Sequence, residues 1–335
     1  MRKFLVIQTA FIGDVVLATA LVEKLHAFFP DARIDFLLRK GNESLLTGHP
    51  FLRQVLIWDK KKNKNLHLLQ MLYRIRREKY DTVINVQRFA ATGLLTAFSG
   101  AREKIGFDKN PFSFLFTKKI RHVVSDGSQA KHEIERNLDL VRDFTDDQPV
   151  KPRLYPAASD YEAVHIYKQK PYITISPASV WFTKQFPPDK WIAFIQSIPA
   201  SLQVYLLGAP SDHALCEGIG QASAHASLRN LAGKLSFLQS AALMQDAVMN
   251  YVNDSAPMHF ASAVNAPVTA VYCSTIAAFG FGPLSDKKYI VETKESLDCR
   301  PCGLHGYRAC PLKHFKCAYT IGNEQLLATL PGAAG

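Results

Sequence analysis

The sequence predicts an α/β protein built from two doubly wound domains, each a parallel sheet covered by helices. Short runs of β-branched and apolar residues alternate with segments of helical periodicity in both halves of the chain, as in such sheets. The 335 residues, 47% of them hydrophobic, suffice for two domains with ordinary cores. Residues 145–160 are rich in Pro, Asp and Ser and lack periodicity, as linkers do. We therefore expect one domain over residues 1–155 and another over 156–335.

The first half begins with a strand, a loop and a helix. KFLVIQ is a short apolar run, TAFIGD is typical of a turn into a helix, and VVLATALVEKLHAFF has apolar residues at helical spacing until Pro30 ends it. Further strands are expected at RIDFLLRK, QVLIWD, DTVINVQ and KIGF, with a helix at LHLLQMLYRIRREKY.

The second half repeats this alternation. Strands are expected at PYITISPAS, QVYLLGAP, AVMNYVND and APVTAVYCS, and helices at WIAFIQSIPA, FLQSAALMQDA and APMHFASAVNA. Two such domains place a cleft between the carboxyl ends of their sheets, which is where ligands of doubly wound folds bind.

Several familiar classes are excluded by missing motifs. The sequence has no GxGxxG after its first strand, no P-loop, no GxSxG and no HExxH, which argues against dinucleotide-binding dehydrogenases, P-loop NTPases, common hydrolases and zinc proteases. We see no secretory signal and no run of about 18 apolar residues. The protein is expected to be soluble, or at most bound to a membrane surface.

The net charge of +11 is confined to one part of the chain. Residues 1–120 hold 21 Lys and Arg against 10 Asp and Glu, and the rest is neutral. Such asymmetry favours a polyanionic partner, for which nucleic acid, anionic lipid and a phosphorylated glycan all qualify, although a solvated basic face without a partner is the simpler alternative for any one cluster. The clusters are Lys60, Lys61, Lys62 and Lys64, and Arg74, Arg76, Arg77 and Lys79.

Asp14 is the first candidate for chemistry, because it lies where the first strand turns into its helix. A carboxylate at this position caps backbone amides, which alone would explain the residue type. If it faces a cleft, it can equally accept the proton of an attacking hydroxyl.

Two further segments carry polar side chains at strand ends. After YITI, Ser176, Ser179, Thr183 and Lys184 lie in a loop before a helix that begins near Pro187 and Pro188, an arrangement that often holds phosphates but is otherwise a surface loop.

In YVNDSAPMHFASAV, residues 251–264, Asn253, Asp254 and Ser255 end a strand and open a helix. Such a segment suits a ribose, a sugar or a phosphate. Alternatively Asp254 or Ser255 is an N-cap and His259 is merely buried.

Together these three segments resemble the lipopolysaccharide heptosyltransferases of glycosyltransferase family 9, in particular the type that adds the second core heptose. That family opens with a strand, a short loop ending in Gly-Asp and an apolar helix, as LVIQTAFIGDVVLATAL does. Its signature of Asn, Asp, Ser, a small residue, any residue, Met and His matches NDSAPMH, and its Lys before an aromatic residue and a Pro matches KQFP at 184–187. The matches fall in order across essentially the whole chain.

The resemblance implies the GT-B fold, two Rossmann-like domains facing across a cleft, with the acceptor bound by the first and the nucleotide sugar by the second. It implies an inverting transfer of heptose from ADP-heptose that requires no metal or other cofactor. Asp14 matches the proposed general base, and Lys184 matches the lysine that holds the donor pyrophosphate. The residues implied to bind the donor are Ser179, Lys184, Asn253, Asp254, Ser255, Met258 and His259.

Two departures from the family pattern concern the donor. Ala256 stands where the family usually has Gly, and its Cβ can crowd a phosphate that approaches the backbone. Leu238 stands where several relatives have an acid that contacts the nucleotide sugar. The nucleotide base is therefore inferred from the family alone.

Four of the six cysteines cluster late in the chain: Cys299, Cys302, Cys310 and Cys317, with His305 and His314 among them. Their spacing can hold a structural zinc ion, while free thiols or a disulfide are the alternatives. Some heptosyltransferase relatives have similar cysteine-containing tails, which suggests a local structural feature rather than a catalytic one.

We therefore expect a transferase that adds heptose to the inner core of lipopolysaccharide. Its acceptor would be a phosphorylated, lipid-linked glycan that meets the basic N-terminal surface, where Lys60, Lys61, Lys62 and Lys64 are the candidate contacts. The enzyme would be cytoplasmic and peripheral to the anionic inner membrane. The alternatives are a related transferase that uses another sugar nucleotide for a different surface glycan and, more distantly, a nucleic-acid-binding protein, for which no recognised module is present.

Overall fold

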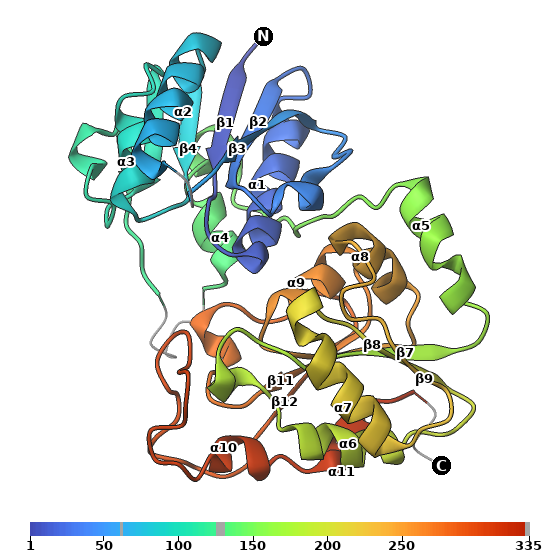
Figure 1. Ribbon diagram of the computed structural model, residues 1–335. Helices are drawn as coiled ribbons and strands as arrows, with labels where there is room; N and C mark the ends of the chain where they lie inside the picture. Colours follow the sequence, from blue (N-terminus) through green and yellow to red (C-terminus); the bar gives the residue numbers. More distant parts are fainter. Residues whose placement is uncertain (61–62, 125–130, 332–335) are drawn as a thin grey trace. The chain divides into compact units, whose positions relative to one another are not determined.

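The computed structural model describes residues 1–60, 63–124 and 131–331 (Figure 1). The chain divides into two compact units, Met1–Tyr155 and Pro156–Gly335. Each unit contains one six-stranded sheet in which all neighbouring strands are parallel. This arrangement confirms the α/β architecture that the alternation of strands and helices predicts.

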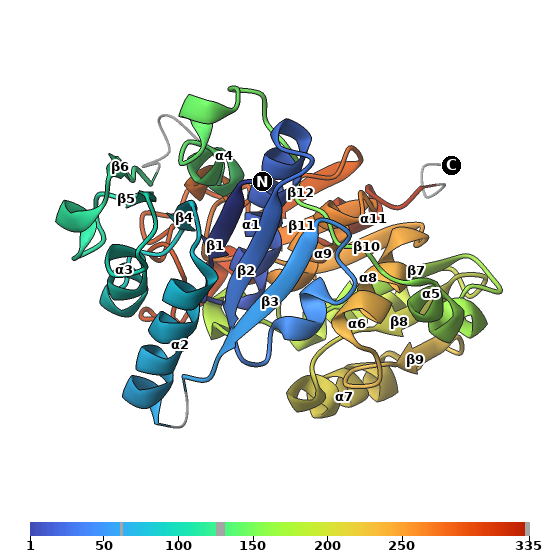
Figure 2. The same cartoon turned by 90° about the horizontal axis from the view of Figure 1, so that it is seen from above.

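The sheet of the first unit has the strand order β3-β2-β1-β4-β5-β6. Its strands are β1 (Lys3–Ile7), β2 (Arg33–Arg39), β3 (Leu52–Trp58), β4 (Thr82–Asn85), β5 (Glu103–Phe107) and β6 (Lys118–Ile120). Its α-helices are α1 (Ile12–Phe28), α2 (Lys64–Glu78), α3 (Ala90–Ala97) and α4 (Glu133–Leu138). Helices α1 and α4 pack together, as do α2 and α3, and Figure 2 shows the two pairs on opposite faces of the sheet.

The sheet of the second unit has the order β12-β11-β10-β7-β8-β9. Its strands are β7 (Tyr172–Ser176), β8 (Gln203–Leu206), β9 (Leu228–Asn230), β10 (Met249–Asn253), β11 (Val268–Tyr272) and β12 (Lys288–Glu292). Its α-helices are α5 (Ala158–Val164), α6 (Pro188–Gln196), α7 (His213–Ser223), α8 (Phe237–Gln245), α9 (Ala256–Ala263), α10 (Lys316–Tyr319) and α11 (Asn323–Leu327). Helix α6 packs against α7 and α11, and α8 packs against α5 and α9.

Each sheet has one point at which the direction of strand addition reverses. In the first sheet it lies between β1 and β4, and in the second between β7 and β10. Helices leave to opposite faces on the two sides of such a point, so a crevice opens at the carboxyl ends of the two central strands. The segments that follow β1, β4, β7 and β10 are therefore where each unit can bind a ligand.

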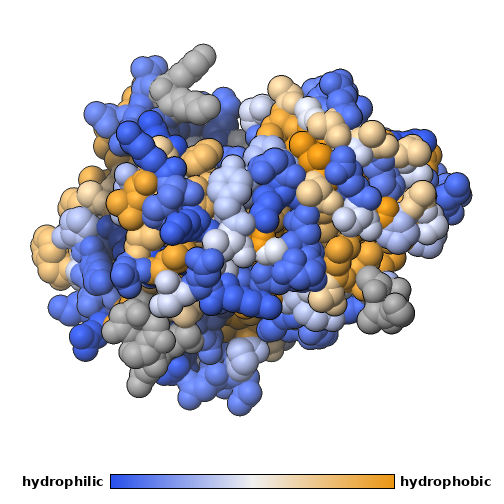
Figure 3. Space-filling model, turned by 90° about the horizontal axis from the view of Figure 1, so that it is seen from below, coloured by the Kyte–Doolittle hydropathy of each residue, from blue (hydrophilic) through white to orange (hydrophobic). Residues whose placement is uncertain are grey.

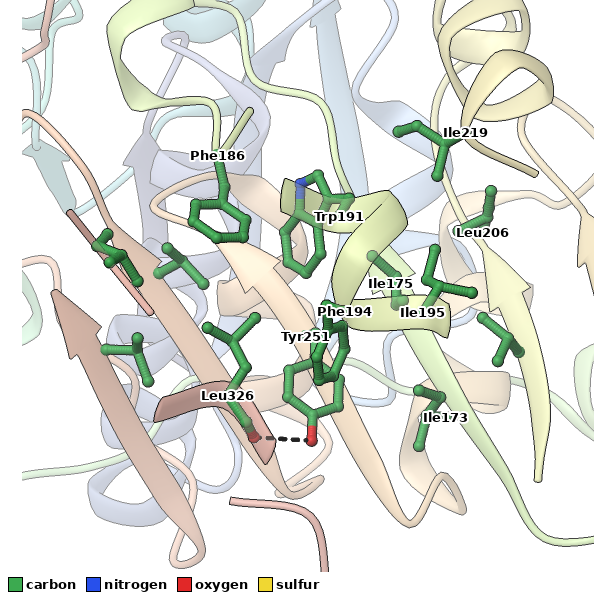
Figure 4. Packing of buried hydrophobic residues seen from close by; sticks show 14 of the residues in the cluster. Ile173, Ile175, Phe186, Trp191, Phe194, Ile195, Leu206, Ile219, Tyr251 and Leu326 are labelled. Carbon is green, nitrogen blue, oxygen red and sulfur yellow. Dashed lines mark hydrogen bonds between the residues drawn. The ribbon is translucent and has the colours of Figure 1, made fainter. Parts of the chain in front are cut away.

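The core of the second unit is largely aromatic where α6 covers its sheet (Figure 4). Trp191 and Phe194 of α6 are fully buried, and the Phe194 and Tyr251 ring centroids lie 4.6 Å apart. The Tyr251 hydroxyl donates a hydrogen bond of 3.3 Å to the carbonyl of Leu326, which attaches α11 to the same cluster. These contacts hold α6, and with it the loop that precedes α6, in a fixed position on the sheet.

All nine strands that the sequence predicts are present, and three further strands were not foreseen. The three are β6, β9 and β12, which lie at sheet edges. β6 and β9 have only three residues each, and β12 is mostly exposed. Strands of this kind lack the continuous apolar run that identifies a buried strand.

Within the ranges that the structure describes, no helix combines the length and the apolar character needed to span a bilayer. On the face shown in Figure 3, most residues are hydrophilic and the hydrophobic ones form small, scattered groups.

The aromatic core gives a prediction about stability. We expect Phe194→Ala to lower the free energy of unfolding of the second unit by about 3–5 kcal/mol, because it removes a buried ring and leaves a cavity. Ile166→Ala is the control, since Ile166 is 63% exposed, and it should change stability by less than about 0.5 kcal/mol. Urea denaturation measures both, and equal effects would show that Phe194 is not part of a tightly packed core.

Candidate functional site

Asp14 lies at the β1/β4 reversal point, three residues after the N-cap Phe11 of α1. Its carboxylate accepts a hydrogen bond of 3.1 Å from the Phe11 N–H, so it does cap the helix. The side chain is half-buried, and loss of hydration is the main reason that the pKa of Asp14 rises to about 6. A carboxyl group with this pKa titrates just below neutral pH, which suits a general base.

A second carboxylate, Glu133, acts on Asp14. Glu133 is the first residue of α4, which packs on α1, and its negative charge is the second cause of the raised Asp14 pKa. Burial also raises the pKa of Glu133, while Arg136, whose Nε donates to the Glu133 carboxylate at 2.7 Å, opposes that rise. The Glu133 carboxylate thus disfavours the ionised form of Asp14.

Two cations lie on the other side of the β1–α1 turn. The Arg39 guanidinium, at the end of β2, stacks on the Phe11 ring at 4.9 Å from its centroid and lowers the Asp14 pKa slightly against the other effects. Lys60 Nζ donates hydrogen bonds of 2.9 Å to the carbonyl and the hydroxyl of Thr9. In the described part of the chain neither cation forms an ion pair.

The environment of Lys60 disfavours its positive charge. Its pKa is lowered to about 8, first by burial and then by the charges of Arg39 and Lys64. An anion bound among these side chains would relieve this repulsion. Of the predicted acceptor lysines, Lys60 and Lys64 are therefore brought near the β1–α1 turn, while Lys61 and Lys62 lie outside the described residues.

In the second unit, the structure brings Lys184 and Asp254 together at the β7/β10 reversal point. Lys184 ends a short 3-10 helix, Phe182–Lys184, and its Nζ lies 2.6 Å from Asp254 Oδ2. The Thr275 hydroxyl donates to the same oxygen at 2.6 Å. The lysine and aspartate side chains are 14% and 8% exposed, so the ion pair is well shielded yet reachable by a ligand.

Asn253 fixes the loop that carries Lys184. Its side-chain oxygen accepts from the Phe186 N–H at 2.9 Å, and its Nδ2 donates to the Pro177 carbonyl at 2.7 Å. The amide is fully buried, and both of its ends are used by the backbone of this one loop. Asn253 therefore positions the loop, and its predicted contact with a donor stays a prediction.

The other predicted donor residues occupy different environments. Ser255 is the N-cap residue of α9 and is half-buried, and the carbonyl of half-buried Ser179 accepts a hydrogen bond of 2.7 Å from Gln185 Nε2. Met258 is fully buried, with its sulfur 3.3 Å from the Tyr272 hydroxyl, and His259 is 6% exposed. The side chains of Met258 and His259 thus belong to the core beneath α9, and their predicted role toward a donor is untested.

The cysteine-rich segment packs against this site. The Tyr307 N–H donates to Thr183 Oγ1 at 2.7 Å, and the Cys302 N–H donates to the Ser274 carbonyl at 2.8 Å. At Gly306, where φ is +76°, a Cβ would lie 2.9 Å from Thr183 Oγ1 and 3.0 Å from Lys184 Cγ. Only glycine allows so close an approach, so the segment acts as a wall of the Lys184 loop.

Cys299, Cys302 and Cys310 lie close enough to Cys317 for their thiols to affect its titration. The pKa of Cys317 is raised to about 12, mainly by burial and then by Cys302. Among the described residues no disulfide forms, and no three His, Cys, Asp or Glu side chains are grouped as a metal ion requires. A structural zinc ion at these cysteines stays a prediction, which elemental analysis of the purified protein tests.

Sequence reasoning missed Glu133, Arg39, Thr183's hydrogen bonds and Thr275. Thr275 had a usable signal, because it directly follows the predicted strand APVTAVYCS. Glu133 had none, because its place beside Asp14 depends on how α4 packs on α1.

The Asp14 environment predicts a titration. We expect the Asp14 carboxyl to titrate near pH 6 in carbon-13 NMR spectra, and Glu133→Gln to lower that pKa, because it removes the neighbouring negative charge. Glu103→Gln, on β5, is the control and should leave it unchanged. An Asp14 pKa near the ordinary value of a carboxyl group would contradict the burial inferred here.

Comparison with known proteins agrees with this picture. The model of glycosyltransferase family 9 (heptosyltransferase) matches residues 68–306. Lipopolysaccharide heptosyltransferase 3 of Escherichia coli is 29% identical over 282 residues, 79% of this chain and 82% of that protein. Lipopolysaccharide heptosyltransferase 2 of E. coli strain K12 is 25% identical over 317 residues, 86% and 87% of the two chains.

A solved structure, that of E. coli ADP-heptose lps heptosyltransferase II, superposes with a TM-score of 0.81 at 21% identity and covers 99% of this chain and 98% of that one. The shared fold is GT-B, as the sequence predicts. Since the family model matches more than half of the residues, the chain belongs to glycosyltransferase family 9, the heptosyltransferase family.

Proposed function

We propose that this heptosyltransferase transfers a heptose from ADP-heptose to the inner core of lipopolysaccharide, with inversion at the anomeric carbon. The observation that carries the proposal is the carboxylate of Asp14, with a pKa of about 6, at the β1/β4 reversal point. The names of the similar proteins, which include lipopolysaccharide heptosyltransferases 2 and 3 and an ADP-heptose enzyme, support the choice of substrates.

Inversion by a single displacement has two chemical requirements, and each unit supplies the groups for one of them. A base must take the proton of the acceptor hydroxyl as its oxygen attacks the anomeric carbon, and Asp14 of the first unit is the candidate. The bond from that carbon to the donor diphosphate breaks at the same time, and positive charge must stabilise the leaving group. Lys184 of the second unit is the candidate, with the Ala256 N–H at the start of α9 as a further donor.

The Lys184–Asp254 pair suggests how a donor engages this site. Asp254 holds the ammonium group at 2.6 Å, and Thr275 orients the carboxylate. A donor diphosphate carries more negative charge than the Asp254 carboxylate, so it can compete with Asp254 for the Lys184 ammonium group. The lysine side chain would then need to move only a short distance. Because Lys184 supplies the charge, we propose that transfer requires no metal.

We propose that the acceptor is a phosphorylated, lipid-linked glycan, reached by the enzyme from the cytoplasmic face of the inner membrane. Arg39 is close enough to Asp14 to affect its pKa. Arg39, Lys60 and Lys64 repel one another, and this repulsion adds to burial, the larger cause, in lowering the pKa of Lys60. A phosphate or carboxylate on the acceptor would neutralise this repulsion beside the reacting hydroxyl.

A transferase that uses another sugar nucleotide is the alternative, and Leu238 is the observation that favours it. Leu238, in α8, is only 4% exposed, and its apolar side chain cannot replace an acid that hydrogen-bonds a ribose. Recognition of the nucleoside would then depend on other groups.

Nucleotide binding tests the donor proposal first. We expect calorimetry to show that ADP and ADP-heptose bind more tightly than GDP or UDP, and that Lys184→Ala weakens donor binding about 10- to 100-fold, because a hydrogen bond to a charged group contributes about 1.5–3 kcal/mol. Lys190→Ala, on α6 outside the site, is the control. Preference for UDP or GDP would move the function to another glycan, and unchanged affinity in Lys184→Ala would contradict its role.

Transfer itself tests the base. With a heptose-deficient lipopolysaccharide core as acceptor and EDTA in the assay, we expect full wild-type activity and a loss of about 10²–10⁴-fold in kcat for Asp14→Asn. Wild-type activity should fall as the pH drops through about 6, because the base is then protonated. Donor affinity of Asp14→Asn should not change, and NMR of the product should show the inverted anomer.

The same assay separates the acceptor site from the chemistry. Lys60→Met should raise KM for the phosphorylated acceptor more than it lowers kcat, while the phosphatase-treated acceptor should react equally with both enzymes. Loss of activity in EDTA, or an active Asp14→Asn enzyme, would refute the proposed mechanism.

A further inference from the structure

Helix α2 of the first unit has apolar side chains on two opposite faces. Leu68, Met71, Leu72 and Ile75 face the sheet and pack into its core. Leu66, Leu69 and Tyr73 are 53%, 61% and 68% exposed. Positions 66, 69 and 73 follow the i, i+3, i+7 spacing of one helical stripe, which lies opposite the buried one.

Arginines flank this exposed stripe. Arg76 and Arg77 lie on its two sides at helical spacing and Arg74 lies one step further round the helix, and all three are exposed. They hold no acidic partner in the described part of the chain: Arg74 donates to the Gln54 side chain at 2.9 Å, and Arg76 donates to the Phe98 carbonyl at 2.9 Å. An apolar stripe bordered by positive charge is typical of helices that lie in a membrane interface.

The exposed apolar surface continues beyond α2. Through its carbonyl, Phe98 is held beside Arg76 at the end of α3, and its ring is 46% exposed. The Phe98 ring centroid lies 6.4 Å from that of Phe112, which lies 6.5 Å from that of Phe114, itself 74% exposed. Figures 1 and 2 show α2 and α3 side by side on one face of the first sheet.

We propose that this surface, the α2 patch of Leu66, Leu69, Tyr73, Phe98 and Phe114, docks the protein onto an anionic lipid bilayer. The leucine and aromatic side chains enter the boundary between lipid headgroups and acyl chains, which accommodates both apolar rings and the polar hydroxyl of a tyrosine. Arg74, Arg76 and Arg77 contact the lipid phosphates. The three arginines without acidic partners select an anionic surface. The docking needs none of the reaction chemistry, so it stands or falls apart from the proposed function.

Vesicle sedimentation of the full-length protein tests the proposal. We expect binding to vesicles that contain phosphatidylglycerol, little binding to pure phosphatidylcholine, and a decline with salt as the charges are screened. Arg76→Gln/Arg77→Gln should weaken binding about fivefold per charge. Leu69→Glu/Tyr73→Glu should weaken it further at equal ionic strength, because it removes the apolar contact as well.

Matched controls change the same chemistry elsewhere. Arg33→Gln, at the amino end of β2, and Ile166→Glu in the second unit remove an exposed arginine and an exposed apolar side chain. Both should bind vesicles like the wild type, and circular dichroism should show that all variants are folded. Donor affinity should be unchanged in the α2 patch variants.

Equal binding to neutral and anionic vesicles, or patch variants that bind like the controls, would overturn the proposal. The proposal would also be overturned if Arg33→Gln weakened vesicle binding as much as the arginine substitutions in the α2 patch do, because total charge alone would then determine attachment. If the protein binds anionic vesicles but transfers no heptose, the docking proposal holds and the proposed function fails. The two proposals can therefore fail independently.

Discussion

A parallel sheet must return the chain across its face after every strand, and this constraint organises both units. All the carboxyl ends gather at one edge, where backbone groups leave the sheet and polar side chains can collect. The interior stays apolar, as the cluster around Trp191 and Phe194 shows. At the reversal points the same constraint sends successive helices to opposite faces of the sheet, and the segments that carry Asp14 in one unit and Lys184 in the other follow the strands there.

The sequence was a good guide to whatever depends on local pattern. The nine predicted strands, the turn into α1 and the loop before α6 follow from local pattern, because apolar periodicity and turn residues are encoded over short stretches. The edge strands β6, β9 and β12 could not be predicted in this way, since a segment such as Leu228–Asn230 owes its strand conformation to the neighbour it pairs with. Secondary structure that tertiary pairing imposes leaves no periodic trace.

The site shows the same division. The positions of Asp14, Lys184 and Asp254 follow from strand ends, but the features that set their chemistry come from distant residues. Glu133 is more than 100 positions from Asp14, yet it contributes to the Asp14 pKa because α4 packs on α1. Thr275 meets Asp254 because β10 and β11 are neighbours. One sequence alone does not show which of many polar residues will meet in this way.

The ion pair between Lys184 and Asp254 has a consequence for how an anion first meets the second unit. Because Asp254 neutralises the charge of Lys184, the ion pair projects little electric field into the solvent, and it contributes little to attracting an anion from beyond the Debye length. Attraction begins only at contact, when a ligand replaces one carboxylate with two phosphates. Such a site selects ligands by their shape and by the number of their negative charges once they are in contact with it. Dilute monovalent anions in the surrounding solution bind it weakly.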